Sequence, residues 1–401
     1  MRRYVIAGNG IAGTTAARAI RELDADGQID VYTDERLPMY SRPRLPELIA
    51  GSVQERDILI YQEQWYGDRR IGLHLRNALT SIDAGGGAAT ASSGDSVPYD
   101  ALLLANGSRC FVPPIPGVDK RNVFALRSVD DAQAIRAAGL GRERAAVLGG
   151  GLLGIEAGNG LRLLGLKVTI VEVFPRLLPR QLDAAGADIL RRRLESLGFE
   201  FRLDAKCSAM TGEEEARSLV LESGEALGCD LVLVSAGVRP SLELARTGGV
   251  NIARGVAVDD HMAASVAGIY VAGDLAEHRG VVYGIWPAAQ QQGAVAGKNM
   301  AGGEATYDGT VPATSLKVAG IDLVSIGEID AEGTKQALVH RDDDALTYRK
   351  LVLDDGRLAG AILLGDSKGA WDLQGAIGRR QDVSSLLEEL RAPSFDFRRL
   401  K

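Results

Sequence analysis

Two glycine loops of the form G-x-G-x-x-G constrain the fold of this chain more than any other feature of its sequence. One follows the apolar run at 5–7, and the other follows the apolar run at 147–148. After each loop come residues with helical spacing and a further apolar strand that ends in an acid, Asp34 or Glu35 in the first case and Glu172 in the second. The sequence therefore predicts two Rossmann-like units.

The three glycines of each loop have different expected roles. The first allows a tight turn, the second lets the backbone approach a pyrophosphate, and the third allows close packing of the helix whose N-terminus holds the phosphates. The glycines concerned are Gly8, Gly10, Gly13, Gly149, Gly151 and Gly154. Because each loop serves one dinucleotide, the chain is expected to bind two.

Two dinucleotides in one chain suggest a bound redox cofactor and a passing donor, a division that fits FAD and NADH. An acid at the end of the second strand bonds ribose hydroxyls and repels a 2′-phosphate, so Glu172 favours NADH over NADPH. Arg176 and Arg180 follow closely and could accept a phosphate, which leaves NADPH open.

Composition narrows the classes of function. The 401 residues carry a formal net charge of -7, without the basic surplus typical of nucleic-acid binding. No apolar run is long enough to span a bilayer, and the N-terminus shows no cleavage pattern of a signal peptide, so a cytoplasmic protein is expected. The cysteines form no C-x-x-C pair and the histidines lack ligand spacing, so no metal site is predicted.

Strand patterns after the second unit indicate that the chain returns to its first domain. The strand and turn at 268–278 contain a Gly-Asp pair that fits no place left in the second unit. From about 306 onward, alternating apolar residues predict antiparallel hairpins, with a turn at 354–356. The predicted fold class is α/β, with a small third domain at the C-terminal end.

The order of these motifs resembles that of the pyridine nucleotide-disulfide oxidoreductase superfamily. MYSRPRLPELIAG at 39–51 and RQLD at 180–183 are more closely similar to NADH:rubredoxin reductases and to the flavin module of assimilatory nitrite reductases. The similarity runs across nearly the whole chain. The superfamily motifs are GNGIAG, ANGS at 105–108, GGGLLGIE, SAGVRP at 235–240 and YVAGD at 270–274.

The resemblance implies an architecture and an activity. It implies two Rossmann-like domains, an FAD-binding domain at 1–112 and 247–305 split by an NAD(H)-binding domain at 113–246, followed by a C-terminal α+β domain at 306–401. In the implied reaction NADH gives a hydride to tightly bound FAD, and the reduced flavin passes electrons to a small acceptor protein such as rubredoxin. A monomer or homodimer is expected.

Roles for individual residues also follow from the resemblance. Asp34 and Glu35 would hold the adenosine ribose of FAD, and Arg42 would contact FAD from the loop beyond. Asp274, after Gly273, would bind the ribityl and pyrophosphate region. Glu156 would lie near the nicotinamide and flavin as the catalytic residue, and the turns of the matching motifs place further cofactor contacts at Asn106, Gly107 and Gly237.

A helix is predicted within 285–300, with Pro287 at its first position, where the missing N–H costs nothing. We expect its N-terminus to face the N1/C2=O edge of the flavin and to stabilise negative charge there by about 1 kcal/mol, which is about 20 mV for two electrons. The neighbouring Trp286 is counted among the expected cofactor contacts. A helix that merely packs in the core is the alternative.

A departure from the family pattern bears on the route of the electrons. Disulfide-reducing relatives carry a cysteine pair after the first unit, and other relatives carry one cysteine in the region matching 39–51; this chain has none there. Electrons are therefore expected to leave from FAD itself. An NADH oxidase that produces peroxide and a redox-sensing protein that binds FAD and NADH remain open as alternatives.

Overall fold

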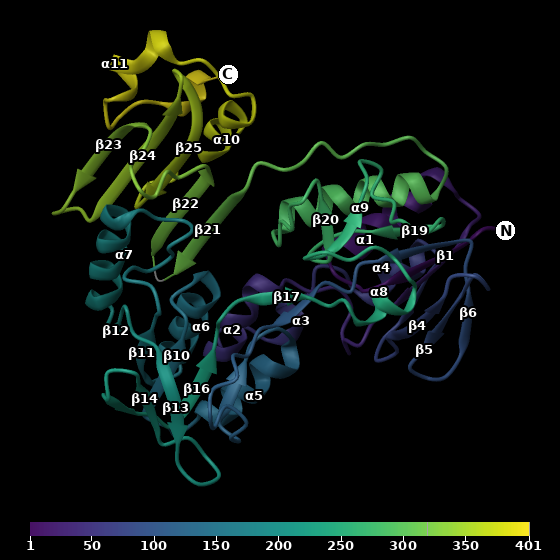
Figure 1. Ribbon diagram of the computed structural model, residues 1–401, viewed down its shortest axis with the longest axis horizontal. Coiled ribbons are helices and arrows are strands. Elements are labelled where there is room, and N and C mark those ends of the chain that lie inside the picture. Colours follow the sequence, from purple (N-terminus) through teal and green to yellow (C-terminus); the bar gives the residue numbers. More distant parts are fainter. Residues whose placement is uncertain (319, 401) are drawn as a thin grey trace. The chain divides into compact units, whose positions relative to one another are not determined.

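The computed structural model describes residues 1–318 and 320–400 (Figure 1). The chain divides into two compact units, each assembled from segments that are separate in the sequence. Unit 1 contains Met1–Arg42, Glu55–Arg109 and Val238–Thr310. Unit 2 contains Pro43–Gln54, Cys110–Gly237 and the residues from Val311 onward. The chain thus leaves unit 1 and later returns to it.

Unit 1 is built on a five-stranded parallel sheet in the order β19-β7-β1-β2-β3. β1 and β7 are apolar and buried along most of their length, as expected for parallel strands covered on both faces. The strand order reverses between β1 and β7, the place where open α/β sheets bind ligands. The strands are β1 (Arg3–Ala7), β2 (Gln28–Tyr32), β3 (Ile71–His74), β7 (Ala101–Leu104) and β19 (Ile269–Val271).

Two helices of unit 1, α1 (Ile11–Leu23) and α9 (Trp286–Met300), pack with their backbones close together. A Cβ at Gly293 would lie 2.3 Å from the carbonyl oxygen of Ala12, and a Cβ at Gly297 would lie 2.5 Å from that of Ala16. The small residues therefore allow a helix from the end of unit 1 to cover the helix that follows the first glycine loop.

Shorter elements complete unit 1 and its connections. They are α3 (Glu55–Ile58), α4 (Glu63–Asp68), β4 (Leu79–Asp83), β5 (Ala88–Ala91), β6 (Ser96–Pro98), β8 (Ser108–Cys110), β17 (Val238–Pro240), α8 (Glu243–Thr247), β18 (Val256–Val258) and β20 (Ala276–His278). β4, β5 and β6 form a three-stranded antiparallel sheet, which the sequence analysis did not predict.

Unit 2 contains a second five-stranded parallel sheet, in the order β12-β11-β10-β16-β9. Its central strand, like that of the first sheet, leads into a glycine loop. The strands are β9 (Val123–Ala125), β10 (Arg144–Leu148), β11 (Lys167–Val171), β12 (Glu200–Arg202) and β16 (Leu231–Val234). The helices nearby are α2 (Leu45–Ala50), preceded by the short turn Arg42–Arg44, and α5 (Val129–Gly139), α6 (Leu152–Leu163) and α7 (Ala184–Ser196).

A small antiparallel sheet also lies between β12 and β16 in the chain. It consists of β13 (Cys207–Thr211), β14 (Ser218–Leu221) and β15 (Ala226–Gly228). Each of the two Rossmann-like parts therefore has its own three-stranded antiparallel sheet and its own glycine loop.

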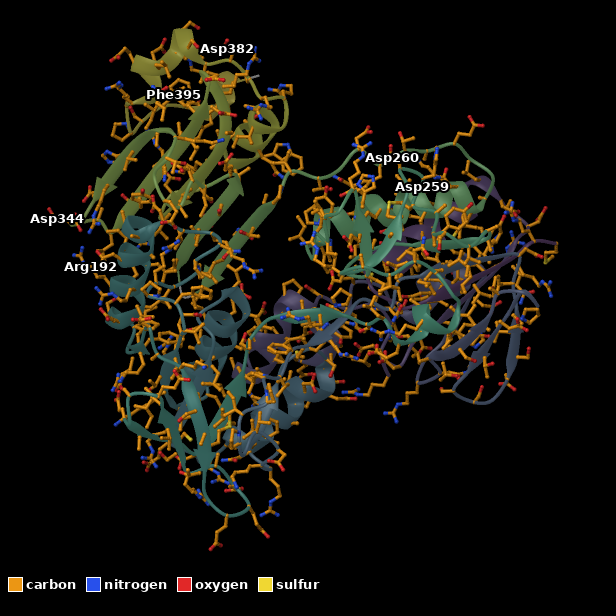
Figure 2. All side chains as sticks on the ribbon, in the orientation of Figure 1. Arg192, Asp259, Asp260, Asp344, Asp382 and Phe395 are labelled. Atoms are coloured by element: carbon orange, nitrogen blue, oxygen red, sulfur yellow. The ribbon has the colours of Figure 1, made fainter. Side chains whose placement is uncertain are left out.

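The C-terminal part of unit 2 is an antiparallel five-stranded sheet in the order β21-β22-β25-β24-β23. The predicted turn at 354–356 is confirmed, because Asp354 pairs with Arg357 across it. α10 packs on β22 and β25, and Phe395 is buried in the same core (Figure 2). The elements are β21 (Ala313–Val318), β22 (Ile321–Gly327), β23 (Gln336–Asp342), β24 (Thr347–Asp354), β25 (Arg357–Leu364), α10 (Ala370–Gly378), α11 (Leu387–Leu390) and the short turns Ser384–Leu386 and Phe397–Leu400.

The predicted α/β class, with two Rossmann-like sheets and a C-terminal α+β part, is confirmed by these sheets. Within residues 1–318 and 320–400, no helix is both long enough and apolar enough to cross a membrane.

Candidate dinucleotide-binding sites

The first glycine loop joins β1 to α1. Gly8 has a φ of +112°, a backbone conformation that glycine adopts without strain. A Cβ at Gly8 would lie 2.2 Å from the carbonyl oxygen of Ala105, just beyond β7. A Cβ at Gly13 would lie 2.0 Å from the carbonyl oxygen of Gly8. The packing of the protein itself therefore requires glycine at the first and third positions of the motif.

The second loop, between β10 and α6, repeats this geometry. Gly149 has a φ of +117°, and a Cβ there would lie 2.2 Å from the carbonyl oxygen of Ser235, just beyond β16. A Cβ at Gly154 would lie 2.0 Å from the carbonyl oxygen of Gly149. Each loop thus packs closely against the residue that follows a neighbouring parallel strand, β7 in the first sheet and β16 in the second.

The middle glycines, Gly10 and Gly151, are different. They precede α1 and α6 with extended φ values of -82° and -78°, which any residue adopts. Among the described atoms, none lies within 4 Å of a Cβ built at either glycine. Neither helix has a side-chain N-cap hydrogen bond in this described part of the chain. Open space beside uncapped N–H groups fits a pyrophosphate lying against each helix start.

The acids after the second strand of each unit have different surroundings. In unit 1, Glu35 accepts hydrogen bonds from Tyr40 Oη at 2.9 Å and from Arg42 Nη2 at 2.9 Å. Asp34 beside it is exposed. The structure therefore brings together Glu35 and Arg42, two of the residues expected to contact FAD.

In unit 2, Glu172 is buried and supports the glycine loop itself. Its Oε2 accepts a hydrogen bond from the N–H of Gly150 at 2.6 Å, and its Oε1 accepts one from the N–H of Phe174 at 3.0 Å. A carboxylate has further lone pairs, so these bonds leave acceptor capacity for a ribose hydroxyl.

Asn9 stands at the position in the first loop that Gly150 has in the second. Its Oδ1 accepts a hydrogen bond from Tyr66 Oη at 2.8 Å, and its Nδ2 is buried without a hydrogen-bond partner among the described residues. Sequence reasoning missed Asn9 and Tyr66, because nothing in the motif distinguishes the residue at this position.

The turn after β7 and the turn after β19 meet in unit 1. Ser108 Oγ donates a hydrogen bond to Asp274 Oδ2 at 2.6 Å, and the N–H of Gly273 donates one to Gln292 Oε1 at 2.9 Å. A Cβ at Gly273 would lie 3.2 Å from the Cβ of Ala12, at the start of α1. Gly273 and Asp274 therefore lie beside the first glycine loop.

Two of these partners were missed. Ser108 belongs to the ANGS motif and could have been chosen from it, whereas nothing in the sequence marks Gln292. Gln292 is fully buried, and its Nε2 has no hydrogen-bond partner within the described ranges. Asn106 Nδ2, in the same turn as Gly107, donates to the carbonyl oxygen of Ser241 at 2.9 Å.

The helix α9 begins at Trp286, so Pro287 is its second residue and not its first, as the sequence analysis expected. The position still suits proline, because none of the first four N–H groups of a helix has an intrahelical partner.

Glu156 lies on α6, two residues after the third glycine of the second loop. Burial raises the pKa of Glu156 to about 7, so its carboxyl group is partly protonated at neutral pH. Gly237 follows β16 with a φ of +94°, and its carbonyl oxygen accepts a hydrogen bond from the N–H of Phe111 at 2.8 Å.

The structure sorts the predicted residues between the two units. Unit 1 contains Gly8, Gly10, Gly13, Asp34, Glu35, Arg42, Asn106, Gly107, Gly273, Asp274, Trp286 and Pro287. Unit 2 contains Gly149, Gly151, Gly154, Glu156, Glu172 and Gly237. Residues expected at FAD and residues expected at NADH are thus gathered around different sheets.

Two Rossmann-like sheets with matching glycine loops define a class of proteins that bind two dinucleotides. The family described as pyridine nucleotide-disulphide oxidoreductase matches residues 2–293, and the rubredoxin NAD+ reductase C-terminal domain matches residues 312–381. The chain belongs to the pyridine nucleotide-disulphide oxidoreductase family, which confirms the resemblance seen in its motifs.

Curated relatives and solved structures agree with this membership. The chain is 32% identical to the NADH-rubredoxin oxidoreductase of Clostridium acetobutylicum over 384 residues, 96% of each chain. A crystal structure of NADH:rubredoxin oxidoreductase from that organism matches 97% of this chain and 99% of its own, with a TM-score of 0.79 and 30% identity. A ferredoxin reductase structure from Rhodopseudomonas palustris matches 100% of this chain and 99% of its own, with a TM-score of 0.91 and 25% identity.

A longer relative is the nitrite reductase [NAD(P)H] of Bacillus subtilis, which is 34% identical over 385 residues. The match covers 96% of this chain and 48% of that protein. This chain therefore spans about half the length of several curated relatives that it matches.

Proposed function

We propose that this protein is an FAD-dependent NADH oxidoreductase that delivers electrons from NADH, by way of tightly bound FAD, to a small redox protein such as rubredoxin. The observation that carries the proposal is the pair of middle glycines, Gly10 and Gly151. Neither the backbone nor the packing requires glycine there, whereas a bound pyrophosphate in each loop would. Relatives named NADH-rubredoxin oxidoreductase and rubredoxin-NAD(+) reductase support the class of acceptor.

In this proposal unit 1 holds FAD. The N–H groups at the start of α1 bind its pyrophosphate, and Glu35, oriented by Arg42, accepts hydrogen bonds from the adenosine ribose. Asp274, fixed by Ser108, binds the ribityl region. Further contacts come from Asp34, Asn106, Gly107, Gly273, Trp286 and Pro287, and the N-terminus of α9 stabilises negative charge at the flavin.

NADH is assigned to unit 2. The N–H groups at the start of α6 bind its pyrophosphate, and Glu172 accepts hydrogen bonds from the adenosine ribose. The charge of Glu172 repels a 2′-phosphate, which supports a preference for NADH over NADPH. Gly237 is proposed to line the same site.

When bound, FAD supplies the ability to take up two electrons together and release them singly. The protein contributes placement and electrostatics. Glu156 is the proposed catalytic residue, since a carboxyl group with a pKa of about 7 can hold a proton at neutral pH and so limits negative charge near the reacting rings.

We further propose the domain division derived from the resemblance: FAD domain at 1–112 and 247–305, NAD(H) domain at 113–246 and C-terminal domain at 306–401. The proposed location is the cytoplasm and the proposed assembly a monomer or homodimer. The compact units support a split first domain, because unit 1 resumes at Val238.

Anaerobic stopped-flow spectroscopy of the purified protein tests the proposal. NADH should bleach the flavin absorbance rapidly, and oxidised rubredoxin should restore it at a comparable rate. Bleaching that rubredoxin does not reverse, but that air reverses with formation of peroxide, would replace the acceptor protein by oxygen and make the protein an oxidase. An absence of bleaching would contradict the proposal and favour a redox sensor.

A further inference from the structure

Two segments of unit 2 that are distant in sequence meet at a buried lysine. Lys350, on β24, is 4% exposed. Its Nζ donates a hydrogen bond to the carbonyl oxygen of Asp330 at 2.7 Å and lies 3.1 Å from Asp183 Oδ2. Tyr348 Oη donates to the same oxygen of Asp183 at 2.6 Å. One buried cation therefore holds Asp183 and Asp330 together.

Asp183 is the last residue of the segment 173–183, which follows Glu172, the acid after the second strand of the second Rossmann-like unit. Its Oδ1 accepts a hydrogen bond from the N–H of Gly186 at 2.9 Å and so caps α7. The segment 173–183 is thus fixed at one end by Glu172, which bonds the N–H of Phe174, and at the other by Asp183.

Asp330 organises the loop 328–335 between β22 and β23. Its Oδ1 accepts hydrogen bonds from the N–H of Thr334 at 2.8 Å and from the Oγ1 of Thr334 at 2.9 Å, and its Oδ2 accepts one from the N–H of Lys335 at 3.1 Å. The turn therefore has a defined shape, and Lys350 secures its base against the segment 173–183.

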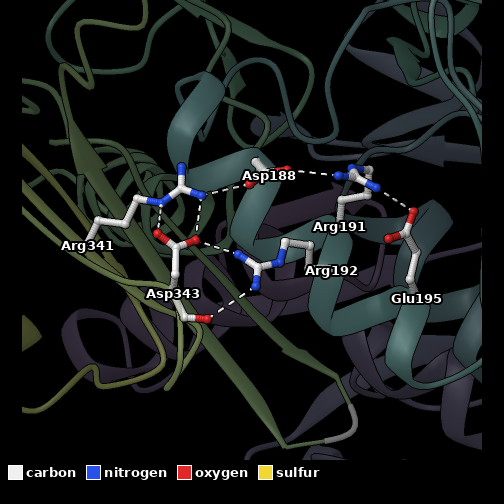
Figure 3. Close-up of polar contacts among 6 residues, drawn as sticks. All are labelled: Asp188, Arg191, Arg192, Glu195, Arg341 and Asp343. Carbon is white, nitrogen blue, oxygen red and sulfur yellow. Dashed lines mark hydrogen bonds and ion pairs between the residues drawn. The ribbon is translucent and has the colours of Figure 1, made fainter.

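A network of ion pairs joins α7 to the hairpin that follows the same loop (Figure 3). Arg341 Nη2 lies 2.9 Å from Asp188 Oδ2 and 2.7 Å from Asp343 Oδ1. Arg192 Nη1, from α7, lies 2.5 Å from the same Asp343 oxygen. Together with the contact between Lys350 and Asp183, these pairs attach the C-terminal sheet to α7, the helix that follows the segment 173–183.

Arg176, in the segment 173–183, forms an ion pair with Glu332, in the loop 328–335. Arg176 Nη2, four residues after Glu172, lies 3.3 Å from Glu332 Oε1 in the loop 328–335. The Arg176 side chain is only 22% exposed, and its Nε has no hydrogen-bond partner within the described parts of the chain. In Rossmann domains an arginine near the strand-end acid accommodates the 2′-phosphate of NADP. Arg176 has that position, but a carboxylate from the C-terminal part already engages it.

We propose that Glu332 is a specificity-determining residue of the pyridine-nucleotide site, supplied by the C-terminal part of the chain. Its carboxylate occupies Arg176 and, with Glu172, places a second negative charge where a 2′-phosphate would bind. NADPH is disfavoured because its phosphate must displace Glu332 from Arg176. This inference rests on the proposed assignment of NADH to the second glycine loop.

Isothermal titration calorimetry of the FAD-loaded full-length protein with NAD+ and with NADP+ tests the inference. Glu332→Gln should tighten NADP+ binding relative to NAD+ by about tenfold, because a charge-assisted bond between Arg176 and the phosphate replaces the ion pair with Glu332, whose side chain is 78% exposed. The double variant Glu332→Gln with Arg176→Gln should lose this gain.

Glu328→Gln is the matched control. Glu328 lies in the same loop and pairs with Lys335 at 2.7 Å, so its replacement should leave the ratio of NADP+ to NAD+ affinity at the wild-type value. A ratio unchanged in Glu332→Gln, or changed equally in Glu328→Gln, would overturn the inference alone. If neither nucleotide binds the wild-type protein, the assignment of NADH to the second glycine loop is wrong, and the proposed function is wrong as well.

Discussion

The first glycine loop, after β1, and the second, after β10, have closely matching backbones and different side chains around them. The φ of the first glycine is +112° in one loop and +117° in the other, and in both a Cβ would lie 2.2 Å from a carbonyl oxygen of the neighbouring strand end. In the first loop the next residue is Asn9, which Tyr66 holds. In the second it is Gly150, which Glu172 holds.

Under the proposed assignment, two loops with matching backbones bind different dinucleotides, so the side chains around each loop would determine which dinucleotide it binds. Glu35 interacts with the side chains of Tyr40 and Arg42, whereas Glu172 interacts with the backbone of its own loop and neighbouring segment. The first acid therefore depends on a side-chain network, and the second is part of the loop structure. Four predictions test this contrast.

The largest effect is expected from the first glycine of each loop. Gly8→Ala and Gly149→Ala should each destabilise the protein by about 3 kcal/mol, because the new Cβ meets a carbonyl oxygen and the backbone keeps a positive φ. Shifts of the urea unfolding midpoint measure the loss. Gly10→Ala and Gly151→Ala are the matched controls, and a comparable shift in either would show that the middle glycine serves packing.

Replacing the acid after the second strand should lower the free energy of unfolding by different amounts in the two units. Glu172→Ala leaves the N–H groups of Gly150 and Phe174 without their acceptor and should cost about 2 kcal/mol. Glu35→Ala should cost about 1 kcal/mol or less, because its pair with Arg42 is partly open to water. Thermal denaturation compares the two, and equal losses would remove the distinction drawn between the acids.

The helices after the loops differ at many positions, and one of these places an ionisable side chain on α6 only: Glu156 corresponds to Thr15 on α1. Burial raises the pKa of Glu156 from 4.5 to about 7. Between these values the folded state binds more protons than the unfolded state, so the contribution of Glu156 to stability falls as pH rises through that window. Thermal melts of Glu156→Gln should show less loss over the window than the wild type, and parallel curves would contradict the raised pKa.

The smallest effect is expected at α9, which packs on the helix of the first loop. Pro287→Gly should loosen the first turn of α9 and make the midpoint potential of bound flavin more negative by about 20 mV. Spectroelectrochemistry measures the shift. An unchanged potential would mean that α9 only packs in the core, as α2 packs on α6 in unit 2.

The sequence predicted both loops, the strands that lead into them, the family and the C-terminal hairpins, because these features are local patterns of a few residues. It did not predict the contacts that distinguish the sites. Tyr66 lies 57 residues from Asn9, Asp274 lies 166 from Ser108, and Glu332 lies 156 from Arg176. No local pattern joins such pairs, since folding alone brings them together.

The sequence also did not predict the shortest strands or the exact first residue of α9. The strands of the two small antiparallel sheets have only three to five residues, too few for a clear alternation. The start of α9 was placed one residue late because proline fits both of the first two helical positions.

The most direct measurement is a crossed comparison of Gly10→Ala and Gly151→Ala, recording the FAD content of each purified variant and its affinity for NADH. The account predicts that Gly10→Ala loses bound FAD, and that Gly151→Ala keeps FAD while binding NADH at least about tenfold more weakly, because each new methyl group takes the room of one pyrophosphate. Loss of FAD from Gly151→Ala, or wild-type behaviour of both variants, would contradict the assignment of one dinucleotide to each loop.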